Sequence, residues 1–430
     1  MPGQASPPAA CVTKLQLFRL RVYNAVIASL YKNQNPMPEL FAFFARLDQL
    51  LTANQALWRL QPLQLPQIPW TDPSLLALLD GLSLDDCDLI DQSPQRQQQL
   101  FGAFWPELFA LDIASPAMFQ PQGLKPPFWL ATDIGGRKWQ QILLFAEATA
   151  QTSLPVLEWC AGKGHLGRVL AQQFQLEVCS VEWQQPLCEQ GAAVAQKLDL
   201  KQRFVCRDVL QHPVGDLFAQ QQQVVALHAC GDLHRSLLVQ AVAAQSQQVD
   251  IVPCCYHLQQ TADYQPMSKT AQQSALRLSK TELKLAVQGQ VTGGERVRRL
   301  RQTEMWWRRA YQLWRAELTG DSRYQPLASV PKHWFSGEFR PFAEWAAAQH
   351  QLVLPPDDDG SRFLQQAEPL LLTQRRIELV QHLFRRPLEL WLVLDRALYL
   401  AEQGYQVQLQ QLCEMALTPR NLLISARKTS

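Results

Sequence analysis

The sequence lacks several features that would define its class at once. No uncharged apolar run approaches the roughly 18 residues that a membrane-spanning helix needs, and the N-terminus has no charged segment before a long apolar one. We therefore expect neither a membrane span nor a signal peptide. The ten cysteines follow no regular spacing, which argues against a disulfide framework and favours free thiols in a reducing cytoplasm. A net charge of +2 gives no global argument for nucleic acid or membrane binding.

The chain is nevertheless long and apolar enough for a large core. It has 430 residues, of which 47% are hydrophobic, so we expect more than one domain or one domain with large additions. Apolar residues at three- and four-residue steps predict helices from residue 12 to about residue 120. We divide the chain into a helical N-terminal region, an α/β domain in two pieces, and a basic, Trp-rich insertion: residues 1–125, 126–268 with 385–430, and 269–384.

The α/β domain is predicted from short apolar runs that alternate with helical segments. These runs predict five strands, at 156–160, 176–183, 203–209, 224–230 and 249–255. Strands and helices at this spacing form βαβ units and hence a parallel sheet, with ligands at the carboxyl ends of the strands. A long helix before Gly404 and two last strands, YQVQLQQL and NLLISARK, predict an antiparallel hairpin that closes the sheet. The predicted fold class is therefore α/β and Rossmann-like.

A glycine loop follows the first predicted strand. Gly162, Gly164 and Gly167 fit the GxGxxG spacing, which permits a tight turn and close approach of the backbone to a ligand. The helix that begins near His165 offers free N–H groups to an anion. Glu182 ends the second strand, where a carboxylate can bind ribose hydroxyls. This combination predicts an adenosine cofactor, and the alternative is a glycine turn without a ligand.

Three features favour S-adenosylmethionine (SAM) over a dinucleotide. Glu158 lies four residues before Gly162, where a carboxylate suits the ammonium group of SAM and would oppose a pyrophosphate. Asp208 ends the third strand and can accept a hydrogen bond from the adenine amino group, although a solvated acid at a strand end is the alternative. The third feature is the closing hairpin, which dinucleotide domains do not usually need. We expect Gly164→Arg to block cofactor entry and to leave the fold intact.

The same residues resemble a known family. Glu-x-x-x-Gly-x-Gly, followed by acids at the next two strand ends, looks like the Rossmann-like (class I) SAM-dependent methyltransferases, although Cys160 stands where most members have glycine. The resemblance implies a methyltransferase that binds SAM. The residues it implies at the cofactor are Glu158, Cys160, Ala161, Gly162, Lys163, Gly164, His165, Gly167, Glu182, Trp183, Asp208, Val209 and His228.

A narrower resemblance rests on longer motifs. These are ALHACGDL, PCCYHL followed by YQPMS, LDRALYLAEQGY and TPRNLLISA. They look like a methyltransferase-like subgroup that includes the eukaryotic methyltransferase-like protein 25 and the glutathione-S-transferase-C-terminal-domain-containing protein. More distantly, they are similar to enzymes that 2′-O-methylate tRNA. The match covers roughly residues 127–268 and 385–428.

The fourth and fifth strands end in a cluster of residues that can carry chemistry. Methyl transfer needs an oriented nucleophile and, in many cases, a general base. His228, Asp232 and His257 are candidates for that base, and Tyr256 is a candidate to stack on a planar substrate. The alternatives are a structural histidine at 228 and an Asp232 that caps the helix beginning at Leu233.

The cysteines of the same cluster admit two further interpretations. Cys230, Cys254 and Cys255 with His257 could bind zinc, but adjacent cysteines are poor paired ligands and no C-x₂-C spacing exists. Cys230 or Cys254 could instead attack a pyrimidine ring, although the surrounding motifs differ from those of the RNA cytosine methyltransferases. Small residues that pack at strand ends are the third interpretation. We expect no metal.

The substrate is indicated only by two basic stretches. Residues 296–315 hold seven arginines against one acid, interleaved with Trp306, Trp307 and Trp314, and residues 375–386 are also basic. Arginine with aromatic residues suits phosphate contact and base stacking, so tRNA or rRNA is our first hypothesis. The alternative for the first stretch is an amphipathic helix with its tryptophans in the core. A protein or small-molecule methyltransferase, a non-catalytic binding module and a dehydrogenase are the other hypotheses, and nothing in the sequence indicates an oligomeric state.

Overall fold

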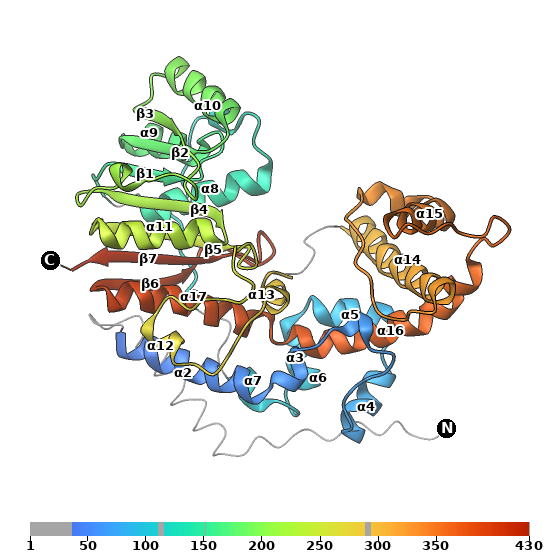
Figure 1. Cartoon of the computed structure of the whole chain (residues 1–430). Coiled ribbons are helices and arrows are strands. Elements are labelled where there is room, and N and C mark those ends of the chain that lie inside the picture. The colour runs from blue at the N-terminus through green and yellow to red at the C-terminus, as the bar shows by residue number, and fades with distance from the viewer. Residues whose placement is uncertain (1–36, 111–115, 151, 289–293, 430) are drawn as a thin grey trace, which may run out of the picture.

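A seven-stranded mixed sheet forms one end of the molecule. The computed structural model describes residues 37–110, 116–150, 152–288 and 294–429, so residues 12–36 of the region predicted to be helical lie outside the described residues. Figure 1 shows the sheet with its helices. Its strands are β1 (Val156–Trp159), β2 (Val178–Glu182), β3 (Gln202–Cys206), β4 (Gln223–Cys230), β5 (Gln248–Cys254), β6 (Tyr405–Gln411) and β7 (Leu422–Lys428).

The strand order confirms the predicted fold class. The order is β3-β2-β1-β4-β5-β7-β6, in which β1 to β5 are parallel and β7 runs antiparallel between β5 and β6. The central strands are apolar and wholly buried, whereas β6 alternates buried and exposed residues because it is the edge of the sheet. The strand order reverses between β1 and β4, and folds of this kind bind ligands in the crevice outside the carboxyl ends of the strands at that point.

Helices cover both faces of the sheet. One buried cluster joins α8 (Gly136–Thr149) and α9 (His165–Phe174) to one face. A second cluster joins α11 (Asp232–Ala243) and α17 (Arg385–Glu402) to the other face. The remaining helix of this domain is α10 (Gln185–Lys197), which packs on β3 and β2. The sheet is therefore a middle layer, as its apolar strands require.

The N-terminal region is helical where the structure describes it. Its helices are α2 (Met37–Ala53), α3 (Gln55–Trp58), α4 (Pro73–Asp80), α5 (Leu84–Asp91), α6 (Pro94–Phe101) and α7 (Pro106–Ala110). Asp72, Ser83 and Ser93 accept backbone N–H groups at the starts of α4, α5 and α6, so each helix begins where its capping residue allows. α2 packs on α17, with the rings of Phe44 and Trp391 5.2 Å apart, which ties this region to the α/β domain.

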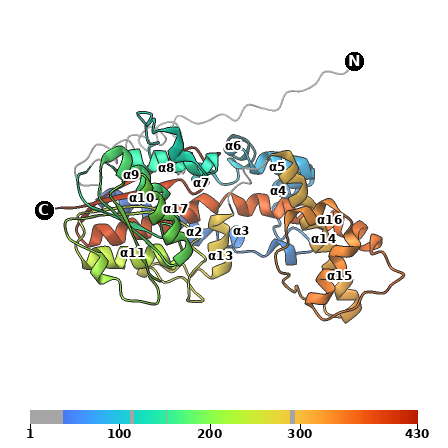
Figure 2. The ribbon, with the colours of Figure 1, turned by 90° about the horizontal axis from the view of Figure 1, so that it is seen from above.

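The segment between β5 and α17 divides its contacts between the two ends of the molecule. The short helices α12 (Lys269–Gln272) and α13 (Lys280–Val287) pack on α17. The helices α14 (Glu295–Thr319), α15 (Phe339–Gln349) and α16 (Ser361–His382) build a separate aromatic core. Figure 2 shows this helical lobe at the end opposite the sheet, with α16 and α17 running between them. Among the described helices, none combines the length and the apolarity that crossing a membrane requires.

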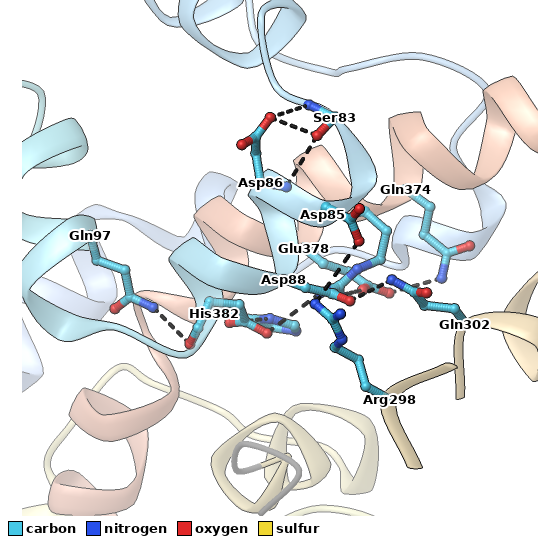
Figure 3. A network of polar contacts seen from close by, with 12 residues as sticks. Ser83, Asp85, Asp86, Asp88, Gln97, Arg298, Gln302, Gln374, Glu378 and His382 are labelled. Carbon is cyan, nitrogen blue, oxygen red and sulfur yellow. Dashed lines mark hydrogen bonds and ion pairs between the residues drawn. The ribbon is translucent and has the colours of Figure 1, made fainter. Parts of the chain in front are cut away.

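A buried polar network holds the lobe to the N-terminal helices (Figure 3). Asp88 of α5 accepts hydrogen bonds from Arg375 at 2.7 Å and from Gln302 at 2.5 Å. Asp91 lies 3.0 Å from both His382 and Arg385. The neighbouring cations hold the pKa of Asp91 far below its usual range although burial opposes them. Two carboxylates of α5 therefore neutralise much of the positive charge of residues 375–386.

Candidate active site

The glycine loop is held open by left-handed backbone. Cys160, Gly162 and Gly164 have φ angles of 56°, 58° and 65°. Cys160 adopts the conformation that glycine usually supplies, at a cost of about 1–2 kcal/mol, so the loop keeps its shape despite the substitution. Glu182 stabilises the loop, because one carboxylate oxygen accepts the Gly162 N–H at 2.9 Å and the other accepts the Gln184 N–H at 3.1 Å.

The three glycines of the motif have different tasks. A Cβ at Gly164 would collide with the Phe204 ring, and a Cβ at Gly167 would collide with the Glu158 carboxylate. Both glycines therefore serve helix packing. At Gly162 no atom lies within 4 Å of a Cβ position, so this residue faces open space at the tip of the loop. Our expectation that Gly164→Arg leaves the fold intact is wrong, because the new side chain would enter the packed interior.

Glu158 supports the loop from beneath. Its side chain is buried, accepts the Ser180 hydroxyl at 2.6 Å and is hydrogen-bonded to the Gly167 backbone. Burial raises the pKa of Glu158 from 4.5 to about 7. The described hydrogen bonds of this carboxylate thus join β2 and the last glycine of the motif, which makes it a positioning residue beneath the predicted cofactor.

The raised pKa of Glu158 predicts a pH-dependent stability. The folded chain binds this proton more tightly than the unfolded chain, so the contribution is full below pH 4.5 and is lost as the pH rises through about 7. The loss is roughly 3 kcal/mol at most. We expect the free energy of unfolding to fall less between pH 5 and pH 8 in Glu158→Gln than in the parent, measured by urea titration. Asp250, whose pKa burial raises to about 6, titrates in both proteins and cancels in the comparison. Equal slopes would contradict the prediction.

The remaining residues predicted at the cofactor surround the loop. Trp183, directly after β2, is 65% exposed and presents a flat aromatic surface. His165 begins α9, and its buried Nδ1 has no hydrogen-bond partner among the described atoms. Asp208 accepts the Leu210 N–H at 3.0 Å and Val209 is buried. The open tip at Gly162, the unpartnered nitrogen and the exposed indole fit the amino-acid and adenosine portions of SAM.

His228 lies at an irregularity in β4. It has a φ of 67°, and the pairing of β4 with β5 shifts register between Leu227 and Cys230. The His228 Nε2 lies 2.6 Å from the side-chain oxygen of Gln141 on α8. With Nε2 as the donor, Nδ1 keeps its lone pair, and burial lowers the pKa of this histidine so that the ring is neutral at pH 7. Gln141 is a site residue that no sequence motif signalled.

Asp232 does not cap α11 as the structural alternative expected. It is the first residue of α11, whose N-cap is Gly231. Its carboxylate accepts the Gln260 N–H at 2.7 Å and pairs with Arg235 at 3.6 Å. Asp232 therefore holds the segment after β5 against α11, while His257 on that segment is only partly buried.

Tyr256 is turned away from the site. It is 1% exposed and lies beneath the guanidinium of Arg396, 5.0 Å from the ring centre. Stacking on a substrate, as predicted from the sequence, is therefore wrong. The reason is Cys255, whose φ of 46° turns the chain after β5 back into the core.

The residues around Tyr256 form a buried brace from the longer motifs. Arg396, which is wholly buried, donates to His234 Nε2 at 2.7 Å and to the Tyr264 hydroxyl at 3.0 Å. Asp395 beside it accepts the Tyr264 hydroxyl at 2.5 Å and the Ser268 N–H at 2.8 Å. LDRALYLAEQGY, YQPMS and the residues after HACGDL thus meet behind the ends of β4 and β5, where they fix these strand ends.

The tryptophans of the 296–315 stretch do not form a binding surface. Trp307 and Trp314 are buried in the core of the helical lobe, and Trp306 packs against that core and donates to the Leu364 carbonyl. Arg309 and Arg315 are buried and donate to backbone carbonyls. The stacking role predicted for these rings is wrong, because helical spacing directs them inward, as the amphipathic alternative proposed.

Comparison with known proteins assigns the α/β domain. Residues 137–262 match the family model of a methyltransferase domain, and no curated protein sequence matches the chain. The matched segment includes the glycine loop, Glu182, Asp208 and the ends of β4 and β5.

Several solved structures that resemble the chain are methyltransferases. Magnesium protoporphyrin IX methyltransferase from Synechocystis PCC 6803 with bound SAH is 10% identical, over 80% of this chain and 100% of that one, with a TM-score of 0.28. A coclaurine N-methyltransferase is 12% identical, over 87% and 95%, with a TM-score of 0.26. A putative sarcosine dimethylglycine methyltransferase from Galdieria sulphuraria is 14% identical over 27% of this chain, with a TM-score of 0.22, and only 44% of its own length is spanned.

The assignment rests on agreement between the matched segment and the geometry. The strand order with an antiparallel β7, the open glycine loop and the acid that holds it all lie where a class I methyltransferase needs them. Residues 137–262 therefore match a methyltransferase domain, and the geometry of its glycine loop fits SAM as the cofactor.

Proposed function

We propose that the chain is a methyltransferase whose substrate is RNA, bound through its phosphate groups in a pocket beside the carboxyl edge of the sheet. The pocket, of about 790 Å³, lies between α6, the start of α17 and the loop before β7. Its walls include Arg385, Arg386 and Arg420. A volume of this size suits a nucleotide-sized part of a larger substrate.

Arg420 is the observation that carries this proposal. No ion pair to its guanidinium occurs within the described part of the chain, and it donates to the Val287 carbonyl. It interacts electrostatically with His228, Cys255 and His257, which places its charge between the pocket and the ends of β4 and β5. Glu389 also interacts with this charge but forms its ion pair with Arg386. A guanidinium without a carboxylate in contact, beside a methyl-transfer site, favours an anionic substrate.

The rest of the pocket supports the same chemistry. Arg385 pairs with Asp91 and Arg386 with Glu389, yet the Arg385 Nε and one Arg386 Nη have no hydrogen-bond partner in the described structure. Such buried N–H groups need an acceptor, and phosphate oxygens supply several. The basic stretch at 375–386 thus contributes to the proposed site through its last two residues. Arg375 binds Asp88 of α5, and Arg376 binds the end of α4 and the Leu82 carbonyl. The more distant similarity of the longer motifs to enzymes that 2′-O-methylate tRNA supports RNA as well.

The experiment offers methyl-labelled SAM to separate RNA, protein and small-molecule extracts from cells that lack the gene. We expect label in RNA that disappears on ribonuclease treatment. Label in the protein or small-molecule fraction would replace RNA by another substrate. SAM binding without label in any fraction would indicate the binding module and would contradict the proposed activity.

Substitution of Arg420 tests the pocket directly. We expect Arg420→Met to raise the KM for RNA by about 10–100-fold, the worth of a charge-assisted hydrogen bond, with an unchanged dissociation constant for SAM. Arg323→Met is the control, because Arg323 is an exposed arginine of the helical lobe. Equal KM values for the two variants would exclude Arg420 from substrate binding.

A further inference from the structure

Three cysteines converge at the ends of β4 and β5. The sulfurs of Cys230, Cys254 and Cys255 all lie within 4.8 Å of one another, and those of Cys230 and Cys254 are 3.4 Å apart. Cys230 and Cys254 are register partners on the adjacent strands, which explains why their sulfurs meet. Three sulfurs at this separation can occupy three corners of a tetrahedron around one soft metal ion.

The backbone is distorted where it gathers these sulfurs. In a regular strand, adjacent side chains point to opposite faces, so two consecutive cysteines could not share one ion. Cys255 has a φ of 46°, and this left-handed residue breaks the alternation directly after Cys254. His228, at 67°, does the same on β4 beside the register shift that precedes Cys230. Our objection that adjacent cysteines are poor paired ligands therefore does not apply to this geometry.

We propose that Cys230, Cys254 and Cys255 bind one zinc ion through their thiolates, with the fourth coordination position open. Cys254 is buried, whereas Cys230 and Cys255 are half-buried, so the site has a dry side and an accessible side. Among the described residues no fourth protein ligand joins the three sulfurs within 4.8 Å. Three protein ligands with one open position is the pattern of a zinc ion that binds an external group.

Electrostatics around the cluster suit such a centre. Three thiolates with one zinc ion carry a net charge of −1, and the positive charge of Arg420 interacts with both Cys230 and Cys255. The site lies on the same edge of the sheet as the glycine loop, since Cys230 also interacts with Cys160. An open coordination position is therefore near the predicted methyl donor, where it could bind a substrate group.

The test measures metal on the purified full-length chain and needs no substrate, so it is independent of the proposed function. The protein is reconstituted with zinc under reducing conditions, desalted and analysed by mass spectrometry for metals. We expect about one zinc ion per chain in the parent and in Cys179→Ser, a buried strand cysteine outside the cluster. In Cys254→Ser and Cys255→Ser we expect at least a tenfold lower occupancy.

Cobalt provides a second measurement that does not depend on occupancy alone. Substitution with Co²⁺ should give thiolate-to-cobalt charge-transfer bands and the intense visible bands of tetrahedral coordination. Circular dichroism of each variant shows whether the sheet is folded, so a loss of metal through unfolding is recognised. Cys255→Ser changes a half-buried position and should therefore disturb the fold less than Cys254→Ser. Absence of metal from the reconstituted parent, or equal occupancy in Cys255→Ser and Cys179→Ser, would overturn the proposal.

Discussion

Replacing Gly162 by arginine is expected to abolish SAM binding while the sheet stays folded. The N–H of Gly162 is held by Glu182 at the tip of the loop, and its Cβ direction is open. A long side chain there would fill the space that the methionine and ribose portions of SAM require. We expect the affinity for SAM to fall at least about 100-fold, which corresponds to roughly 3 kcal/mol.

The control for this variant must carry the same backbone cost. Gly162 has a φ of 58°, so any L-residue there is strained by about 1–2 kcal/mol. Gly320 ends α14 in the helical lobe with a φ of 68° and equally open surroundings. Gly320→Arg should therefore lose similar stability and keep its affinity for SAM. Calorimetric titration with SAM and thermal unfolding separate the two effects.

Gly164→Arg gives a third and different result. Because its side chain would enter the space of Phe204 and Gln202, we expect loss of the folded domain rather than selective loss of the cofactor. If Gly162→Arg binds SAM as the parent does, the cofactor does not lie over this loop.

The main elements of the fold were predictable because their signals are local. Each strand of the parallel sheet is a short apolar run, and the glycine spacing marks the turn that follows β1. Glu182 was predictable as well, since the end of β2 always adjoins the loop in this topology. The closing hairpin followed from the alternation of apolar and polar residues in YQVQLQQL.

Side-chain direction at the site was not predictable from the same signals. Spacing places Tyr256 and His257 after β5, but a left-handed Cys255 decides that the tyrosine faces the core. Nothing in the sequence marks a non-glycine residue for that conformation. The hydrogen bond from His228 to Gln141 joins residues 87 positions apart, so it depends on how α8 packs. Helical spacing also shows that Trp307 lies on an apolar face of α14, but it does not show which helices pack against that face.

A large loss of stability is expected on replacing Asp395, a buried residue of α17. Its carboxylate is inaccessible and accepts the Tyr264 hydroxyl, the Met267 N–H, and both the N–H and the hydroxyl of Ser268. Asp395→Ala would leave these buried donors without an acceptor beside the charged Arg396. We expect the free energy of unfolding of the α/β domain to fall by about 3–5 kcal/mol.

Glu402 offers a matched comparison two turns further along the same helix. It also accepts neighbouring backbone N–H groups, those of Lys269 and Thr270, but it is only half-buried. Because water can replace the lost acceptor there, Glu402→Ala should cost only about 1 kcal/mol. Thermal and urea unfolding of both variants test this ranking. If Asp395→Ala lowers the free energy of unfolding no more than Glu402→Ala does, the buried brace behind β4 and β5 does not fix these strand ends. The positions of His228 and the three cysteines would then need another cause.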